Sequence, residues 1–324
     1  METAISFNQQ QLISELKHYR DQTNRLRKIN EFYGRIVGVV DLTSLIEAYS
    51  IWLMQYVRFK LIGYANPARS RNHFICAEHG PDRRNVMTLA DTIIHQTGNI
   101  PISYRYCNGI HTYVWTLDAK GTHGKIVLFK NNAPMKNDEM QVMDDSLPVM
   151  NESVKKAFEY EEIYHQARRD SLTELPNRLY FDEHIYSIIE LAGRHRRPLT
   201  LAALDLDRFK RINDTKGHLE GDRVLKLVGT ILKKEIRLSD TLIRMGGDEF
   251  LIILQETDLE ASRCLCKRLC NAIKELDIHT DQGRLGLSIG LAEYKSDISL
   301  KQLLSRADDM LYQVKAEGGN GVAG

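Results

Sequence analysis

The sequence lacks a long apolar segment. No uninterrupted apolar run in its 324 residues approaches the ~20 residues that a membrane-spanning helix needs. The strongest stretch, LIEAYSIWLM, is interrupted by Glu47 and is typical of a helix buried in a core. The Met1 end also lacks the apolar segment of a signal peptide. We therefore expect no membrane span and a cytoplasmic location.

The sequence also lacks a disulfide framework and an excess of either charge. Its five cysteines are odd in number and irregularly spaced, which favours reduced thiols. The formal net charge of +1 gives no global field that would attract nucleic acid, so no nucleic-acid partner is expected.

Two groups of cysteine and histidine residues do not have metal-site spacing. Three cysteines share one predicted helix and are expected to be buried reduced thiols: Cys264, Cys266 and Cys270. The first half of the chain holds a second, irregularly spaced set: His73, Cys76, His79, Cys107 and His111. That spacing favours histidines satisfied within the fold over haem or metal ligands, and no ligand is assigned there.

What the sequence does contain is enough chain for about two domains. Residues 8–37 have the pattern of one long helix with apolar residues at alternating spacings of four and three: Leu12, Leu16, Tyr19, Thr23 and Leu26. Two interpretations remain open for this stripe. It is either the seam of a helix pair or a face packed on its own domain.

After Asp41, a predicted N-cap, comes a helix, and then the apolar period shortens. Strands are predicted at FKLIGYA, NHFICAE, ISYRYC, TYVWTLD and KIVLF, with a helix at RNVMTLADTIIHQ after the second strand. This order of helix, two strands, helix and three strands resembles the GAF class of small-molecule-binding domains, in element order alone. The expected signal for such a domain is a small molecule or a protein.

A second long helix is expected over residues 137–169. Its apolar stripe consists of Met143, Leu147, Met150, Val154 and Phe158, and it then becomes polar in EYEEIYHQARRD. This is typical of a stalk between domains. A parallel homodimer would bury this stripe together with that of residues 8–37, and activity is then expected to depend on the register of residues 143–165. The predicted organisation is an N-terminal helix (1–36), a GAF-like sensor domain (37–136), a signalling helix (137–169) and a C-terminal domain (170–324).

The C-terminal domain alternates strands and helices around the apolar hairpin TLIRMGGDEFLIIL, which predicts an α/β sandwich with a mixed sheet. The glycine-rich end, EGGNGVAG, is interpreted as low-complexity sequence.

Carboxylates gather at predicted strand ends in this domain. Asp205 and Asp207 end the strand LAALDLD and would share one face, although Asp207 is also well placed to cap the next helix. Asp248 and Glu249 follow the tight turn Gly246-Gly247. An unpaired carboxylate at a buried strand end is costly, so convergence of Asp205 with the hairpin acids favours a hard cation such as Mg²⁺ over solvated acids.

Groups suited to a nucleotide follow Asp205. Lys210, at the start of a helix, is placed to meet a phosphate. Asp222 is able to accept from the N1–H and 2-amino groups of guanine, a donor pair that adenine lacks. Asn213 and Gly217 are also explained by a helix-ending turn.

Taken together, these segments resemble the GGDEF family of diguanylate cyclases. The hairpin carries GGDEF itself, and the family's other blocks follow in order: DSLTELPNR, LDLDRFKRINDTKGHLEGD, LSIGLAE and RADDMLYQVKAEGGN. The resemblance covers about residues 165–324. It implies a fold related to the palm of nucleotidyl cyclases and polymerases, and the joining of two GTP into cyclic di-GMP with release of two pyrophosphates.

The resemblance also implies roles for individual residues. Asp205, the Leu206 carbonyl and Asp248 would hold Mg²⁺, or Mn²⁺ in its place, with support from Glu249. Asp248 would also accept the proton of the 3′-hydroxyl, which makes Asp248 and Glu249 the candidate catalytic pair. The implied substrate contacts are Asn213, His218, Asp222, Lys210 and Lys315. Since one domain holds one GTP, the symmetric product implies a homodimer.

A product-inhibition site is implied by RLSD, where Arg237 and Asp240 have the family's spacing to Gly246, and by Arg268 on a later helix. RxxD is also common at helix ends. The sequence departs from the family at Gly319, where the family usually has an arginine.

The leading hypothesis is therefore a diguanylate cyclase regulated by its N-terminal domain and by product. The alternatives are a catalytically weak cyclic di-GMP receptor that acts through the RxxD site, and a palm cyclase that makes a mononucleotide.

Overall fold

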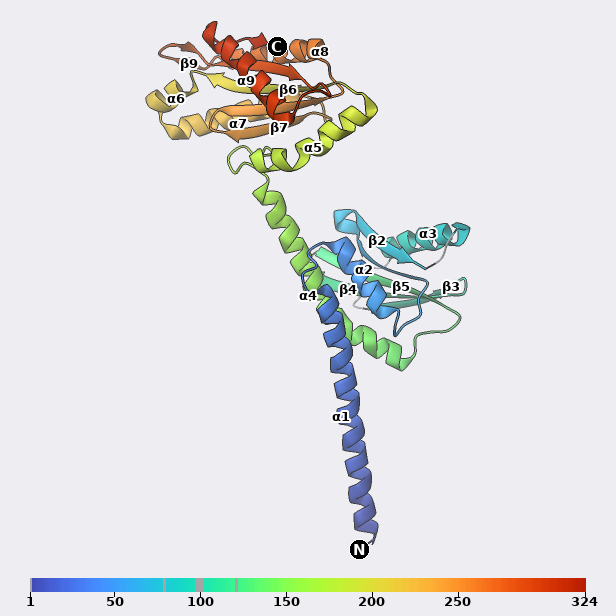
Figure 1. Ribbon diagram of the computed structural model, residues 1–324. Coiled ribbons are helices and arrows are strands. Elements are labelled where there is room, and N and C mark those ends of the chain that lie inside the picture. Colours follow the sequence, from blue (N-terminus) through green and yellow to red (C-terminus); the bar gives the residue numbers. More distant parts are fainter. Residues whose placement is uncertain (1, 78–79, 97–101, 120–121) are drawn as a thin grey trace. The chain divides into compact units, whose positions relative to one another are not determined.

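The structure is a computed structural model that describes residues 2–77, 80–96, 102–119 and 122–324. It divides into two compact units, Met1–Ile163 and Tyr164–Gly324 (Figure 1). Among the described residues, no helix combines the length and the apolar character needed to cross a bilayer. His79 lies outside the described residues.

The N-terminal unit is built on a five-stranded antiparallel sheet with the order β2-β1-β5-β4-β3. Its strands are β1 (Leu61–Asn66), β2 (Arg71–Cys76), β3 (Ile102–Cys107), β4 (Ile110–Ala119) and β5 (Thr122–Asn131), with a 3₁₀ turn η1 (Pro67–Arg69) between the first two. Each lies where the apolar alternation predicts a strand, so the predicted element order is confirmed.

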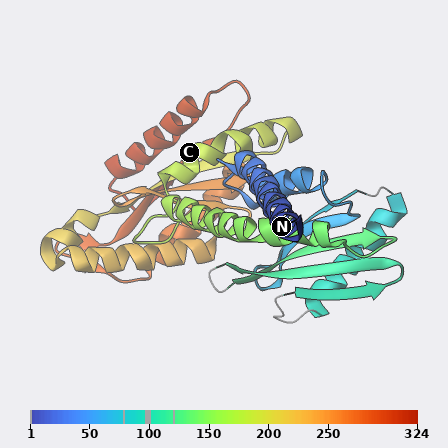
Figure 2. The same cartoon turned by 90° about the horizontal axis from the view of Figure 1, so that it is seen from below.

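Helices cover both faces of this sheet. The helices are α1 (Glu2–Ile36), α2 (Leu42–Leu53), α3 (Gly80–Gln96) and α4 (Asn137–Ala167). Figure 2 looks nearly along α1 and shows α1, α2 and α4 on one side of the strands. Phe32 of α1, Trp52 of α2 and Met143 of α4 share one buried cluster with that face of the sheet. Val86 and Ala90 of α3 pack on the opposite face.

The apolar stripe of α4 belongs to the core of its own unit. Met143, Met150, Val154 and Phe158 are buried in the cluster beneath the sheet, and Leu147 packs partly buried against it. Because a parallel pair of such stalk helices would need this stripe exposed, a second copy of the chain does not bury it. The stripe has its partner within the unit because α4, α2 and the sheet share one buried apolar cluster.

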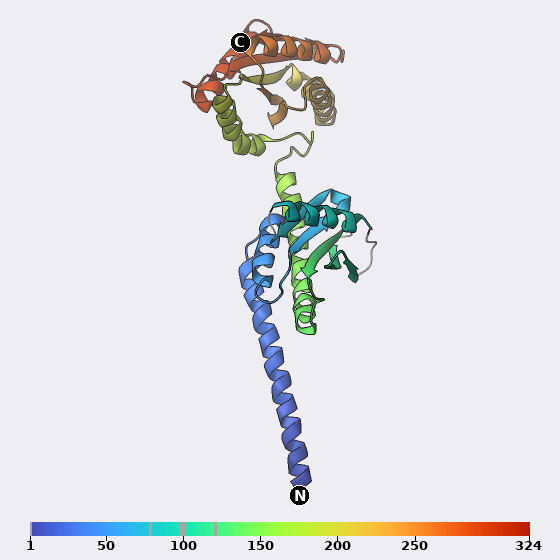
Figure 3. The ribbon, with the colours of Figure 1, turned by 90° about the vertical axis from the view of Figure 1, so that its right-hand side faces the viewer.

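The stripe of α1 has no such partner within the unit. Only the last turns of α1 reach the core, through Ile29, Phe32 and Ile36. Farther toward the N-terminus the helix extends away from the sheet (Figure 3). Leu12, Leu16, Tyr19 and Leu26 are between 57% and 65% exposed. For these residues the interpretation as a face packed on its own domain is wrong.

The C-terminal unit contains a second five-stranded sheet, with the order β12-β11-β6-β8-β7. Its strands are β6 (Leu199–Asp207), β7 (Thr241–Gly246), β8 (Glu249–Gln255), β11 (Gly286–Glu293) and β12 (Val322–Ala323). All neighbours are antiparallel except β11 and β12, so the predicted mixed sheet is confirmed. A small hairpin of β9 (His279–Thr280) and β10 (Gly283–Arg284) lies outside this sheet.

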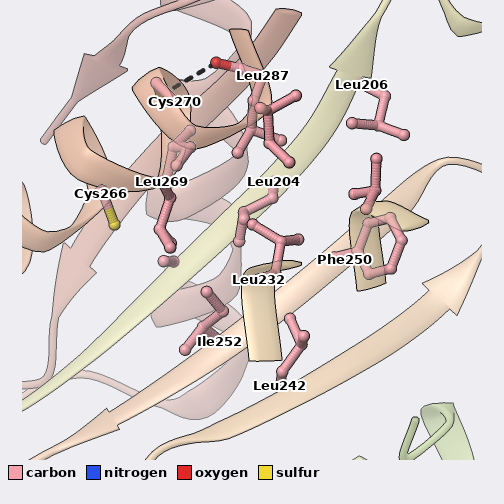
Figure 4. Packing of buried hydrophobic residues seen from close by; sticks show 14 of the residues in the cluster. Leu204, Leu206, Leu232, Leu242, Phe250, Ile252, Cys266, Leu269, Cys270 and Leu287 are labelled. Carbon is pink, nitrogen blue, oxygen red and sulfur yellow. Dashed lines mark hydrogen bonds between the residues drawn. The ribbon is translucent and has the colours of Figure 1, made fainter. Parts of the chain in front are cut away.

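Alternation along the strands gives the sheet two apolar faces, and helices cover both. The helices are α5 (Arg178–His195), α6 (Phe209–Lys216), α7 (His218–Glu235), α8 (Leu259–Lys274) and α9 (Leu300–Ala316). Leu204 and Leu206 of β6 face α6, α7 and α8, in the cluster that Figure 4 shows. Leu201 and Ala203 face α5 and α9. Side chains at odd-numbered positions of β6 therefore point toward α9.

The cysteines of α8 and the chain end differ in part from expectation. Cys266 and Cys270 are buried, as expected, and the Cys270 thiol donates to the Leu287 carbonyl (Figure 4). Burial raises the pKa of the Cys270 thiol to about 12, which makes it inert. Cys264 is exposed, so the prediction of burial is wrong for it. The glycine-rich end is not featureless, because β12 pairs with β11.

Candidate active site

The GGDEF turn is a tight two-residue connection between β7 and β8. Gly246 pairs with Glu249 across the hairpin, and Gly246 and Gly247 have φ angles of +151° and +53°. A residue with a Cβ rarely adopts the second conformation, which explains the glycine. Glu249 is thereby the first residue of β8, and Asp248 lies on the turn itself.

Arg244 stabilises the turn through hydrogen bonds. Its Nε and one terminal nitrogen donate to the Gly247 carbonyl at 3.1 and 2.7 Å, and its other terminal nitrogen donates to Oδ1 of Asp170 at 2.7 Å. Asp170 Oδ1 also accepts from the backbone N–H and the hydroxyl of Thr173. A charged residue inside an apolar strand was the available sequence signal for Arg244, and the sequence analysis assigned it no role.

Asp205 and Glu249 stand opposite each other across β6 and β8, on the face toward α9. Nζ of Lys315, from α9, lies 2.7 Å from Oδ2 of Asp205. Burial raises the pKa of Asp205, and the Asp248 and Asp207 carboxylates raise it further, while Lys315 opposes them. The predicted convergence of Asp205 with the hairpin acids is therefore present, and a lysine partly neutralises it.

The position of Lys315 depends on close packing between α9 and β11. A Cβ at Gly290 would lie 2.0 Å from the Ala307 carbonyl oxygen, so only glycine lets the helix backbone approach this strand. Burial also raises the pKa of Asp308 on the same helix, with Glu249 adding to the effect. Asp308 is thus a further carboxylate that faces the site and that the sequence analysis did not select.

Asp207 has a different role from the one predicted from its position before α6. That helix has Arg208 as its N-cap and no side-chain capping bond. Asp207 instead accepts from the Ser288 hydroxyl and from the Asn320 backbone N–H, both at 2.7 Å. Capping fails because Arg208 adopts a left-handed φ of +66°, which turns the chain between Asp207 and the helix. Its predicted placement on the same face as Asp205 is confirmed.

Gly319, the departure from the family pattern, packs against Asp207. Its φ is +79°, and a Cβ there would lie 2.7 Å from Oδ1 of Asp207. An arginine would therefore be strained in this backbone conformation.

The acidic end of the sheet offers oxygen donors but no closed metal cage. Within residues 2–77, 80–96, 102–119 and 122–324, no three histidine, cysteine, aspartate or glutamate side chains form a ready-made metal cluster. Two carboxylates and one backbone carbonyl, the set implied for Asp205, Asp248 and Leu206, are oxygen donors of the kind Mg²⁺ takes while keeping waters and binding substrate phosphates. The donor chemistry fits a substrate-borne Mg²⁺ better than a closed protein cage.

The proposed guanine residues lie on and beside the α6–α7 connection. Gly217 joins the two helices with a φ of +82°, so the helix-ending turn is present. A Cβ at Gly221 would lie 1.9 Å from Oδ1 of Asn213, so Gly221 leaves the space that the Asn213 side chain occupies. His218 and Asp222 are exposed in the first turns of α7, and Lys210 is exposed on α6.

The proposed inhibitory residues gather near the C-terminal end of α7. Arg268 of α8 donates to the side chain and the backbone carbonyl of Glu235, the last residue of α7. Arg237 follows with an exposed side chain. Asp240 is only 8% exposed and accepts from the backbone N–H of Arg237, which is the helix-end role that the sequence also allowed.

Comparison with known proteins gives a consistent result for this unit. Residues 167–321 match the family described as diguanylate cyclase, GGDEF domain. Diguanylate cyclase DgcS of Shewanella oneidensis is 35% identical over 189 residues, 58% of this chain and 62% of that protein. Diguanylate cyclase DgcP of Pseudomonas aeruginosa is 41% identical over 157 residues, 47% of this chain and 23% of that protein. The chain thus spans less than two thirds of either relative.

Among solved structures, the coiled coil and GGDEF domain of DgcB from Caulobacter crescentus, in complex with c-di-GMP, is similar with a TM-score of 0.52 and 28% identity. The match covers 56% of this chain and 98% of that one. The family match, the relatives and the fold agree: residues 167–321 are a GGDEF domain.

Proposed function

We propose that the chain is a diguanylate cyclase that condenses two GTP into cyclic di-GMP and two pyrophosphates. The observation that carries the proposal is the pairing of Asp205 with Glu249 across the sheet, beside a positive-φ turn that presents Asp248. A stiff hairpin that holds carboxylates at a buried strand end suits a metal-bound triphosphate.

In this proposal the chain's own groups bind and orient the nucleotide. Asp205, Asp248 and the Leu206 carbonyl hold Mg²⁺ or Mn²⁺, with Glu249 beside them. When bound there, the metal would supply positive charge that offsets the charge of the phosphates. Asp248 accepts the proton of the 3′-hydroxyl, and Lys210 and Lys315 contact phosphates. Lys315 then exchanges part of its contact with Asp205 for a phosphate oxygen.

On the base, Asp222 and Asn213 pair with the guanine edge, while His218 adds a substrate contact. The exposed positions of His218 and Asp222 support access to a ligand, and the space left by Gly221 supports a fixed Asn213. Arg237, Arg268 and Asp240 form the site for inhibitory product.

The active form in this proposal is a homodimer, because a symmetric product requires two GTP-loaded domains. The exposed stripe of α1 supports a helix pair between two copies. The N-terminal unit is proposed as a GAF-like sensor of a small molecule or protein, on the strength of its element order. Since the α4 stripe is buried through Phe158, dependence of activity on stalk register is proposed for residues 159–165 only.

The direct test is incubation of the purified chain with GTP and Mg²⁺, followed by chromatography of the products. Cyclic di-GMP and pyrophosphate in a one-to-two ratio are expected, and Asp248→Asn should abolish both. A product derived from a single GTP would instead identify a mononucleotide cyclase.

A second function, a catalytically weak receptor for cyclic di-GMP, is favoured only by Gly319, which removes the family's usual arginine. Tight binding of added cyclic di-GMP without any turnover of GTP would establish the receptor and exclude the cyclase.

A further inference from the structure

A cavity of about 520 Å³ opens in the N-terminal unit, at the end of its sheet. Three segments surround it: residues 56–60 after α2, the last residues of β5, and the first turn of α4. The volume lies in the range of small-molecule sites in proteins. None of the residues that line the cavity belongs to the GGDEF domain.

The lining of the cavity is strongly cationic. Arg58, Lys60, Lys130 and Lys136 contribute positive charge, and the carboxylates in the lining are Asp138 and Glu139. Asn131 adds an amide. Such a lining repels cations and attracts an anionic ligand.

One carboxylate in the lining is already committed to the fold. Lys130 and Glu139 are each 9% exposed and form an ion pair with both carboxylate oxygens engaged. Glu139 Oε2 also accepts from the Lys136 backbone N–H at 2.8 Å. This buried ion pair adds no net charge to the lining. Asp138 accepts from the backbone N–H of Glu139 at 3.0 Å.

Two cationic side chains in the lining have no partner among the described residues. The guanidinium of Arg58 and the ammonium of Lys136 form no hydrogen bond or ion pair with any residue that the structure describes. Both residues are exposed to solvent and line the cavity. Two cationic donors that line one cavity match the oxygens of a carboxylate or phosphate group.

We propose that this cavity binds a small oxyanion, a ligand whose carboxylate or phosphate groups are held by Arg58 and Lys136. The ligand contacts the first turn of α4, and α4 ends at Ala167, where the GGDEF domain begins. Occupancy therefore acts on the helix that leads directly into that domain (Figure 1). The regulatory part of this inference rests on the proposed cyclase activity, whereas the binding part does not.

The test is calorimetric titration of the full chain with inorganic phosphate and, separately, with succinate, at matched ionic strength. Saturable binding of either probe is expected, and the probe that binds identifies the ligand group. The double variant Arg58→Ala/Lys136→Ala should weaken binding by about tenfold or more, since each lost contact is charge-assisted. Arg83→Ala, at an exposed position of α3, is the control and should bind as the unmodified chain does.

A second measurement reports on α4 directly. Hydrogen exchange at the amides of residues 139–142 should slow with the bound probe in the unmodified chain and in the control, but not in the double variant. Binding that survives unchanged in the double variant, or no saturable binding of either probe, would overturn the site. Binding without any change in cyclic di-GMP formation would overturn its regulatory role alone, and the chain's basal turnover of GTP is measured separately.

Discussion

Arg244 and Asp170 lie 74 positions apart in the chain, yet their side chains meet at 2.7 Å. Arg244 also donates twice to the Gly247 carbonyl. One guanidinium therefore connects the N-terminal end of the GGDEF domain to the turn that carries Asp248. The arginine side chain is 10% exposed and the aspartate 22%. A displacement of Asp170 would therefore act through Arg244 on the turn of the proposed active site.

Replacing Arg244 with alanine should destabilise the C-terminal unit. The change leaves Asp170 and the Gly247 carbonyl without their donors, which typically costs about 1–3 kcal/mol in the free energy of unfolding. Urea denaturation measures the loss, and turnover of GTP should fall with it. Arg197→Ala is the control, since its pair with Glu256 is exposed and should contribute less than about 1 kcal/mol. Equal effects of the two changes would show that Arg244 acts only as a surface charge.

Replacing Lys315 with methionine should shift the pH profile of the cyclase. Burial and nearby carboxylates already raise the pKa of Asp205, and the ammonium is the influence that lowers it. Without that ammonium the pKa of Asp205 rises further. A carboxylate must be ionised to hold metal, so the acidic limb of kcat/KM should move to higher pH.

The same argument predicts a stability effect. A raised folded-state pKa contributes stability at low pH that is lost as the pH rises through that pKa. In metal-free buffer, Lys315→Met should therefore lose thermal stability at neutral pH more than at acidic pH. Lys301→Met, also exposed on α9, provides the comparison. An unchanged acidic limb in Lys315→Met would separate Lys315 from the titration of Asp205.

Replacing Asp222 with serine should reduce selectivity for GTP over ATP. Loss of a paired contact to guanine costs about 1–3 kcal/mol, or roughly tenfold to a hundredfold in the ratio of kcat/KM values. Competition between the two nucleotides measures this ratio, and the concentration of Mg²⁺ for half-maximal activity should not change. Asp214→Ser, exposed on α6, is the control. The assignment fails if the unmodified chain turns over both nucleotides equally.

Replacing Arg237 with alanine should relieve product inhibition. Its exposed guanidinium is free to hold a phosphate, whereas Asp240 is mostly occupied by the backbone. The concentration of cyclic di-GMP for half inhibition should rise by about tenfold or more, while the initial rate stays nearly unchanged. Lys234→Ala, exposed near the same helix end, tests whether any nearby charge has this effect. Inhibition that is unaltered in Arg237→Ala would make RLSD an ordinary helix end.

Replacing Leu16 with glutamate should weaken the proposed homodimer. Leu16 is 60% exposed within its own chain, so the change costs the unit no core packing. In a helix pair it would bury a charge, which is strongly unfavourable. Analytical ultracentrifugation should show a shift to monomer and a parallel loss of GTP turnover. Lys17→Glu changes charge off the stripe and should leave the association intact. A monomeric but fully active unmodified chain would contradict the homodimer.

Local patterns determined most of what the sequence predicted correctly. The tight turn at Gly246-Gly247, with its positive φ angles, follows from glycine chemistry, which acts over a few residues. Periodicity located every strand of the N-terminal sheet. The partner of a stripe is not a local property, so the similar patterns of α1 and α4 concealed one exposed face and one buried face.

In the candidate active site, too, local patterns predict some contacts and long-range packing determines the others. The approach of Glu249 to Asp205 follows from the apolar strands that carry them, because antiparallel register fixes which residues stand opposite. The approach of Lys315 to Asp205 depends on how closely α9 packs on Gly290, and the bond from Arg244 to Asp170 depends on where a loop returns. Long-range contacts of this kind need the whole fold.

The bonds of Asp207 to Ser288 and Asn320 have a practical consequence for mutagenesis. Asp205 and Asp207 belong to one motif and share one face, so an alanine scan would test them together. Loss of activity in Asp207→Ala would nevertheless report the release of the final strand from the sheet, since Asn320 precedes β12. A scan read by activity alone would count a structural anchor as a metal ligand.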